Sequence, residues 1–215
     1  MKQKKMQEPE GIRQIRHRWS RTIEIWVAYQ TFLNRQVEIG PDKICLNELV
    51  VVQTTHTLLV AYYSFLYSLF DPSGSDFEKA TEELLPHFPA RAVEIRNLIL
   101  EHWQQICGPI TRIRHNIGFH HAKNRKGVET GYDAYKEIHP QSSEYIMNLF
   151  RVFFRILDEV YDYSEPYGIP PRKEDIEPLY QMAMELKRFI EENPTEKVLD
   201  AAQSFLHKIP KKPNQ

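Results

Sequence analysis

The segment from Leu49 to Phe70 is 22 residues long and contains no Asp, Glu, Lys or Arg. A helix of that length is long enough to cross the hydrocarbon core of a bilayer. However, Gln53 and His56 lie in its first half among three threonines. A Gln or His side chain in hydrocarbon is costly unless it has a partner, and no basic cluster flanks the segment. The pattern therefore favours a helix buried at the centre of a bundle over a membrane span.

The rest of the chain divides into runs of helical periodicity separated by Gly and Pro turns, without an alternating strand pattern. These runs predict helices over about residues 11–37, 46–70, 75–85, 89–107, 110–122, 143–160, 173–192 and 195–208. Long apolar helices must bury against one another. We therefore expect an all-α, up-and-down bundle of four or five long helices over residues 11–163. Residues 164–215 form a C-terminal helical appendage that ends in a disordered PKKPNQ tail.

Three local features refine these boundaries. Ser75, with Glu78 three residues later, resembles a capping box and predicts a helix start. Pro109 lacks a backbone donor, so a kink or break is expected after Gly108. The stretch KNRKGVETGYD, residues 123–133, is charged and contains two glycines, which indicates a loop.

The formal net charge is −1, so a nucleic-acid interaction would have to use a local patch. Cys45 and Cys107 are far apart and form no CxxC pair, which favours reduced thiols in a cytoplasmic protein. The charged first residues lack the apolar run of a signal peptide. These observations together predict a cytoplasmic protein without a membrane span.

Several kinds of active site have no matching motif in the sequence. There is no GxGxxG or P-loop, no GxSxG and no HExxH. A metal site built from His115, His120 and His121 is disfavoured, because adjacent helical residues point about 100° apart and no carboxylate lies nearby. We therefore expect neither a metal nor a cofactor.

The stretch RIRHNIGFHH, residues 112–121, combines aliphatic and cationic side chains. On an ideal helix Arg114 lies about 20° from His121, and Asn116 lies about 40° from His120. Gly118, if it lies in mid-helix, costs about 1 kcal/mol relative to Ala. Taken singly, Arg114 would be an ion-pair partner for a buried carboxylate and the histidines ordinary packed or surface residues. Taken together, they combine phosphate-binding and acid–base groups, which metal-free phosphodiester cleavage requires.

This segment resembles the signature of the HEPN superfamily of all-helical domains, over residues 11–163. The family motif is an Arg followed four to six residues later by a His, near the end of a late core helix. Five residues separate Arg114 from His120, and six separate it from His121. The family usually has a polar residue, often Asn, directly after the Arg. Here that position is His115, and Asn116 follows it.

The resemblance implies a metal-independent endoribonuclease of a toxin–antitoxin or anti-phage system, with its site formed across a homodimer of motif helices. Arg114 would stabilise the scissile phosphate, His120 would be the acid–base residue, and Asn116 would orient the substrate. His121 and His115 would assist. The alternative implied by the resemblance is a non-catalytic dimeric module that binds nucleotide, RNA or a protein partner such as an antitoxin.

Basic residues near the motif are candidates for RNA binding: His115, Lys123, Arg125 and Lys126. Tyr132 and Tyr135 could stack on bases, although such tyrosines are more often loop anchors. A second basic stretch lies at the N-terminus, and we favour a solvated helix face there over an RNA contact. It contains Lys2, Lys4, Lys5, Arg13, Arg16, Arg18 and Arg21.

Overall fold

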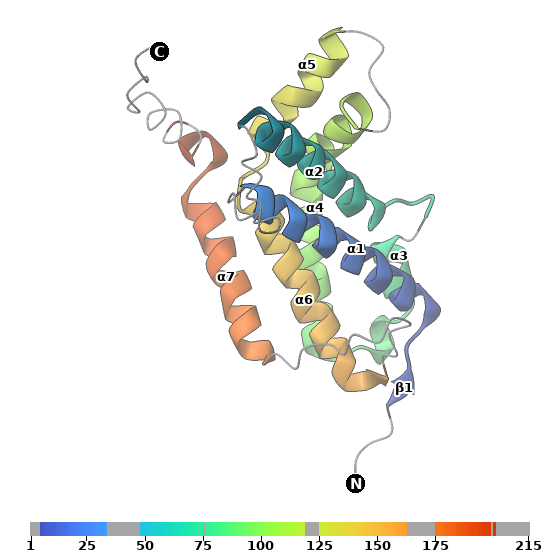
Figure 1. Ribbon diagram of the computed structural model, residues 1–215. Helices are drawn as coiled ribbons and strands as arrows, with labels where there is room; N and C mark the ends of the chain where they lie inside the picture. The colour runs from blue at the N-terminus through green and yellow to red at the C-terminus, as the bar shows by residue number, and fades with distance from the viewer. Residues whose placement is uncertain are drawn as a thin grey trace, which may run out of the picture.

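The computed structural model describes residues 5–33, 48–74, 76–118, 125–162, 175–198 and 200, and these are almost entirely helical. The all-α bundle is thereby confirmed (Figure 1). Its main elements are α1 (Glu10–Leu33), α2 (Glu48–Ser68), α3 (Phe77–Glu82), α4 (Ala90–Asn116), α5 (Arg125–Asp133), α6 (Ser142–Val160) and α7 (Ile176–Glu192).

Short elements complete the described part of the chain. Two 3₁₀ turns, η1 (Leu85–His87) and η2 (Ala134–Glu137), follow α3 and α5. The strands β1 (Met6–Gln7) and β2 (Tyr161–Asp162) pair in parallel and bring the start of the chain to the end of α6.

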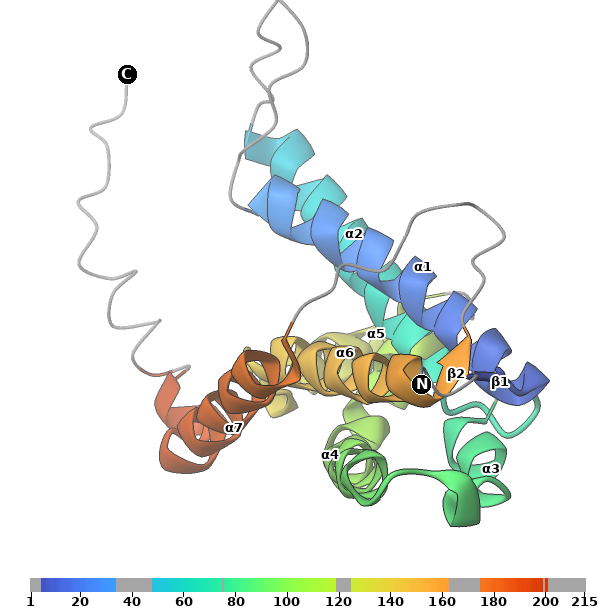
Figure 2. The ribbon, with the colours of Figure 1, turned by 90° about the horizontal axis from the view of Figure 1, so that it is seen from below.

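The centre of the bundle is α6, which packs against α1, α4 and α7. Phe150 and Phe153 are fully buried, and nearly every residue of α6 from Ser142 to Leu157 is buried or half-buried. The sequence had placed α2 at the centre, and this was wrong. Its buried residues are Tyr62, Tyr63, Ser64 and Leu66, whereas no residue from 51 to 61 is buried. Figure 2 shows α1 and α2 running together away from α4 and α6.

The described residues contain no helix that combines the length and the hydropathy needed to cross a membrane.

The sequence predicted a kink or a break at Pro109, and of these the break was wrong, because helix α4 continues through Pro109. A proline within a helix removes one backbone hydrogen bond and costs about 3 kcal/mol. Here Pro109 is itself buried, and Ile106, Ile110 and Ile113 are buried before and after it. The burial of this apolar face on both sides of the proline offsets the lost bond.

Two further boundaries differ from the sequence-based ones. Helix α3 is capped by Asp76 rather than by Ser75, because the Asp76 carboxylate accepts hydrogen bonds from the amides of Glu78 and Lys79. Residues 125–133 form α5, where the charge and the two glycines had indicated a loop.

Helix α7 packs on α6 and is also linked to α4 by long polar side chains. Leu179 and Ala183 are its buried residues. Three side-chain pairs connect α7 to α4, and the partners in each are 86 positions apart in the sequence. They are Arg91–Glu177, Glu94–Tyr180 and Glu101–Lys187. A constant offset over three pairs means that α4 and α7 run parallel and in register.

Candidate functional site

The motif begins on α4, but the helix ends earlier than its sequence suggests. The last helical residue is Asn116, and the amides of Ile117 and Gly118 both bond to the carbonyl of Ile113, at 2.9 and 3.1 Å. A Cβ atom at position 118 would lie 2.8 Å from the carbonyl oxygen of Arg114, so this turn requires glycine. The prediction that Gly118 lies in mid-helix was wrong.

Several predicted site residues lie outside the described residues. They are His120, His121 and Lys123; the side chain of Arg125, which begins α5, is likewise not described. Their place relative to Arg114 therefore stays a prediction.

Arg114 is held in a defined position. Its guanidinium carbon lies 4.3 Å from the ring centroid of Tyr67 on α2, which is a cation–π contact. Its Nη2 lies 4.0 Å from Oδ2 of Asp71, and its side chain remains 23% exposed. Arg114 is thus oriented by a ring and a carboxylate while still reachable from solvent.

Asp71 lies in the turn that follows α2. Its Oδ1 accepts hydrogen bonds from the amide and the hydroxyl of Ser73, at 3.0 and 2.7 Å. These two bonds are the main reason that the pKa of Asp71 is lowered, and the positive charges of Arg114 and Arg18 lower it further. Asp71 is therefore ionised at neutral pH.

A second arginine reaches the same turn from α1. The Nη1 of Arg18 donates a 3.0 Å hydrogen bond to the carbonyl of Ser68, the last residue of α2. A Cβ atom at position 74 would lie 3.4 Å from that Nη1, so the guanidinium lies in contact distance of the turn. Arg18 and Arg114 thus both reach the turn that contains Asp71, and both charges act on its carboxylate, although sequence reasoning had assigned Arg18 to a solvated face.

Other motif residues point elsewhere. Arg112 forms an ion pair with Glu137 of η2. Asn116 is half-buried, and a Cβ atom on Gly131 of α5 would lie 2.9 Å from its Cβ atom. The structure therefore joins Arg114 to α2 and Asn116 to α5, rather than bringing the two together.

The remaining candidates for RNA binding lie on or near α5 and the end of α4. His115 and Lys126 are exposed. Tyr132 is 48% exposed and stacks on the imidazole of His56, with ring centroids 5.5 Å apart, while Tyr135 packs against His56 and Tyr63.

His56 was not identified as a site residue from the sequence. Its Nε2 and the hydroxyl of Tyr135 are buried and have no hydrogen-bond partner among the described residues. The only sequence signal for His56 was its presence in the charge-free segment.

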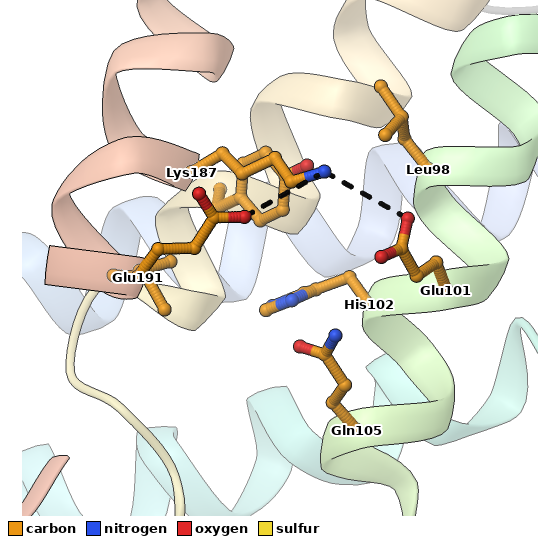
Figure 3. Close-up of a pocket in the computed structure, with 8 residues that line it drawn as sticks. Leu98, Glu101, His102, Gln105, Lys187 and Glu191 are labelled. Carbon is orange, nitrogen blue, oxygen red and sulfur yellow. Dashed lines mark ion pairs between the residues drawn. The ribbon is translucent and has the colours of Figure 1, made fainter. Parts of the chain in front are cut away.

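A small cavity of about 50 Å³ lies between α4, α6 and α7 (Figure 3). It is lined by Leu98, Glu101, His102, Gln105, Tyr145, Lys187, Ile190 and Glu191. The Nζ of Lys187 lies 3.9 Å from a carboxylate oxygen of Glu101 and of Glu191. A space of this size holds only a few water molecules. The carboxylates are already paired with Lys187, so the cavity is better suited to linking helices than to binding a substrate.

His102 forms one wall of this cavity and is only 5% exposed. Burial lowers its pKa to about 4, although hydrogen bonds to the carbonyl of Ser142 and the side chain of Gln105 oppose this. It is therefore neutral at pH 7. Nothing in its sequence neighbourhood distinguishes it from a surface histidine.

Among the described residues, no three His, Cys, Asp or Glu side chains lie close enough together to bind a metal ion.

No protein family, curated protein or solved structure matches this chain in sequence or fold.

Proposed function

We propose that this protein is a HEPN-like, metal-independent endoribonuclease of the cytoplasm that acts in a toxin–antitoxin or anti-phage system. The proposal rests on the motif of residues 114–121. The observation that supports it best is the environment of Arg114, which is oriented by Tyr67 and Asp71 near the end of α4 and remains partly exposed. An arginine held in this way is suited to bind a phosphodiester, because its planar donors match phosphate oxygens.

The chemistry assigns one role to each motif residue. The RNA 2′-hydroxyl attacks the adjacent phosphorus, giving its proton to a base, while the 5′-oxygen leaves and takes a proton from an acid. His120 is the proposed acid–base residue, and Arg114 stabilises the negative charge that develops on the phosphate. Asn116 orients the substrate, and His115 and His121 assist.

A homodimer through the motif helix would complete the site. Arg114 and Asn116 lie on different sides of α4, one toward α2 and the other toward α5. A two-fold partner would supply the missing groups from its own copy of the motif. Lys123, Arg125 and Lys126 would attract the RNA backbone beside it.

RNA cleavage in EDTA tests the proposal. The purified protein should cleave single-stranded RNA without metal, and Arg114→Ala or His120→Ala should lower the rate at least ~100-fold. Arg112→Ala is the matched control, because Arg112 lies two residues away and pairs with Glu137 instead. Light scattering should report a dimer. Cleavage by Arg114→Ala at the wild-type rate would contradict the proposal.

The second candidate is a non-catalytic HEPN-like module that binds RNA, nucleotide or a protein partner. The contact between Arg114 and Asp71 favours it, because an arginine already facing a carboxylate can serve binding or assembly alone. In that case the wild-type protein leaves RNA intact, and Arg114→Ala weakens binding rather than cleavage.

A further inference from the structure

Arg114 has unused hydrogen-bonding capacity. Its guanidinium carries five N–H donors, but it donates no hydrogen bond to any of the described residues. Among the described residues, its guanidinium contacts the ring of Tyr67 and the carboxylate of Asp71. The separation of 4.0 Å from Asp71 exceeds the 2.7–3.0 Å of the bonds that Asp71 receives from Ser73. The pair is therefore an electrostatic contact, and none of the described residues accepts a hydrogen bond from Arg114.

Two arginines and one carboxylate share this turn, so its local charge is positive. Arg18 uses Nη1 on the carbonyl of Ser68 and lies against Gly74, beside Asp71. The Asp71 carboxylate interacts with both guanidinium groups. Its Oδ1 is held by Ser73, and its Oδ2 lies 4.0 Å from Nη2 of Arg114.

We infer that Arg18 and Arg114 form a binding site for a phosphate group, and that Asp71 is an internal anion that competes with this phosphate. The inference deepens the proposed function and rests on it for the identity of the natural ligand as RNA. Arg18 then becomes a second phosphate contact, supplied by α1 of the same chain. The negative charge of Asp71 holds the arginines in place in the absence of ligand and weakens the binding of any phosphate that enters.

Binding of an RNA that cannot be cleaved tests this directly. The probe is a labelled 2′-O-methyl oligouridylate, which lacks the attacking hydroxyl, with inorganic pyrophosphate as a second ligand. Asp71→Asn keeps the acceptor for Ser73 and removes the charge, so both ligands should bind about tenfold more tightly. Asp133→Asn is the control, because Asp133 is exposed and pairs with Lys136.

Arg18→Gln should weaken the binding of both ligands about tenfold. For the oligonucleotide it should also lower the slope of log affinity against log salt concentration by about 0.7. Arg18→Lys retains the charge and should bind nearly as well as the wild type. It therefore separates loss of a phosphate contact from loss of the bond to Ser68. Arg112→Gln should leave both affinities unchanged, and thermal unfolding of every variant checks the fold.

Unchanged affinity in Asp71→Asn, or equal behaviour of Arg18→Gln and Arg112→Gln, would overturn the inference. If wild-type protein cleaves unmodified RNA while these variants bind normally, the proposed function stands and the inference fails. If RNA is neither bound nor cleaved but pyrophosphate binding follows Arg18 and Asp71, the phosphate site stands and the ribonuclease proposal fails.

Discussion

Gly131 lies where α5 meets the end of α4, and it shows how a single residue fixes the geometry beside the motif. A Cβ atom there would lie 2.7 Å from Cγ1 of Ile117 and 2.9 Å from Cβ of Asn116. These separations are shorter than real carbon contacts, so one of the two helices would have to shift. The end of α4 and α5 can therefore pack this closely because Gly131 has no side chain.

Gly131→Ala is expected to destabilise the protein by about 1–2 kcal/mol, because overpacking outweighs the gain in helix propensity. Gly108→Ala is the matched control. Apart from its chain neighbours, its Cβ atom would have no contact nearer than 3.9 Å, and the gain in helix propensity is opposed by crowding against the ring of Pro109, so the free energy of unfolding should change by less than about 0.5 kcal/mol. Urea denaturation measures both, and a stabilised Gly131→Ala would contradict the packing argument.

At the scale of single residues, the sequence identified Arg114 and Asn116 but not their partners. One of the two readings that the sequence allowed was an ion pair between Arg114 and a buried carboxylate; the carboxylate that faces it, Asp71, is 4.0 Å away and 21% exposed. Arg18 lies 96 residues away in the chain, and only the packing of α1 beside α2 brings it to the same turn. No local pattern could have predicted that contact.

At the scale of elements, two kinds of contact hold α7. Leu179 is 7% exposed and is buried in the core. The polar contacts of α7 with α4 involve exposed partners: the side chains of Arg91 and Glu177 are 38% and 59% exposed. Exposed ion pairs contribute little because water and salt screen them. The apolar contact should therefore dominate the attachment of α7.

Leu179→Ala should lower the free energy of unfolding by about 2–4 kcal/mol. Arg91→Gln, which breaks the first of the three in-register pairs, should lower it by less than about 1 kcal/mol. Chemical denaturation of the two variants side by side makes the comparison. A larger loss from Arg91→Gln than from Leu179→Ala would show that the polar pairs hold α7.

At the scale of the whole molecule, a pair of carboxyl groups and one histidine change the free energy of unfolding with pH in opposite directions. Arg16 forms ion pairs of 2.6 Å with Glu8 and 2.9 Å with Asp158, and burial raises the pKa of both carboxyl groups. Their raised pKa values favour the folded state in acid, and this contribution is lost as pH rises through the folded values. The lowered pKa of His102 has the opposite effect. Its contribution is present above its ordinary value of 6.5 and is lost as pH falls toward about 4.

His102→Asn should therefore change the pH dependence of stability. Protonation of His102 lowers the free energy of unfolding of the wild type by up to about 3 kcal/mol between pH 6.5 and 4, and the variant has no such loss. The difference in unfolding free energy between variant and wild type should shift by that amount in favour of the variant as pH falls. Urea denaturation from pH 7 to 4 measures this, and parallel curves for the two proteins would contradict it.

The sequence by itself determined the helical class and the approximate positions of most helices. These follow from local periodicity and turn residues, which act over a few positions. Only the tertiary structure decided that α6 lies at the centre, that α4 continues through Pro109, and that Arg18, Asp71 and Arg114 meet at one turn. Such outcomes depend on which helices pack together. Because apolar burial is non-directional, the hydrophobic pattern of one helix does not specify the helix against which it packs.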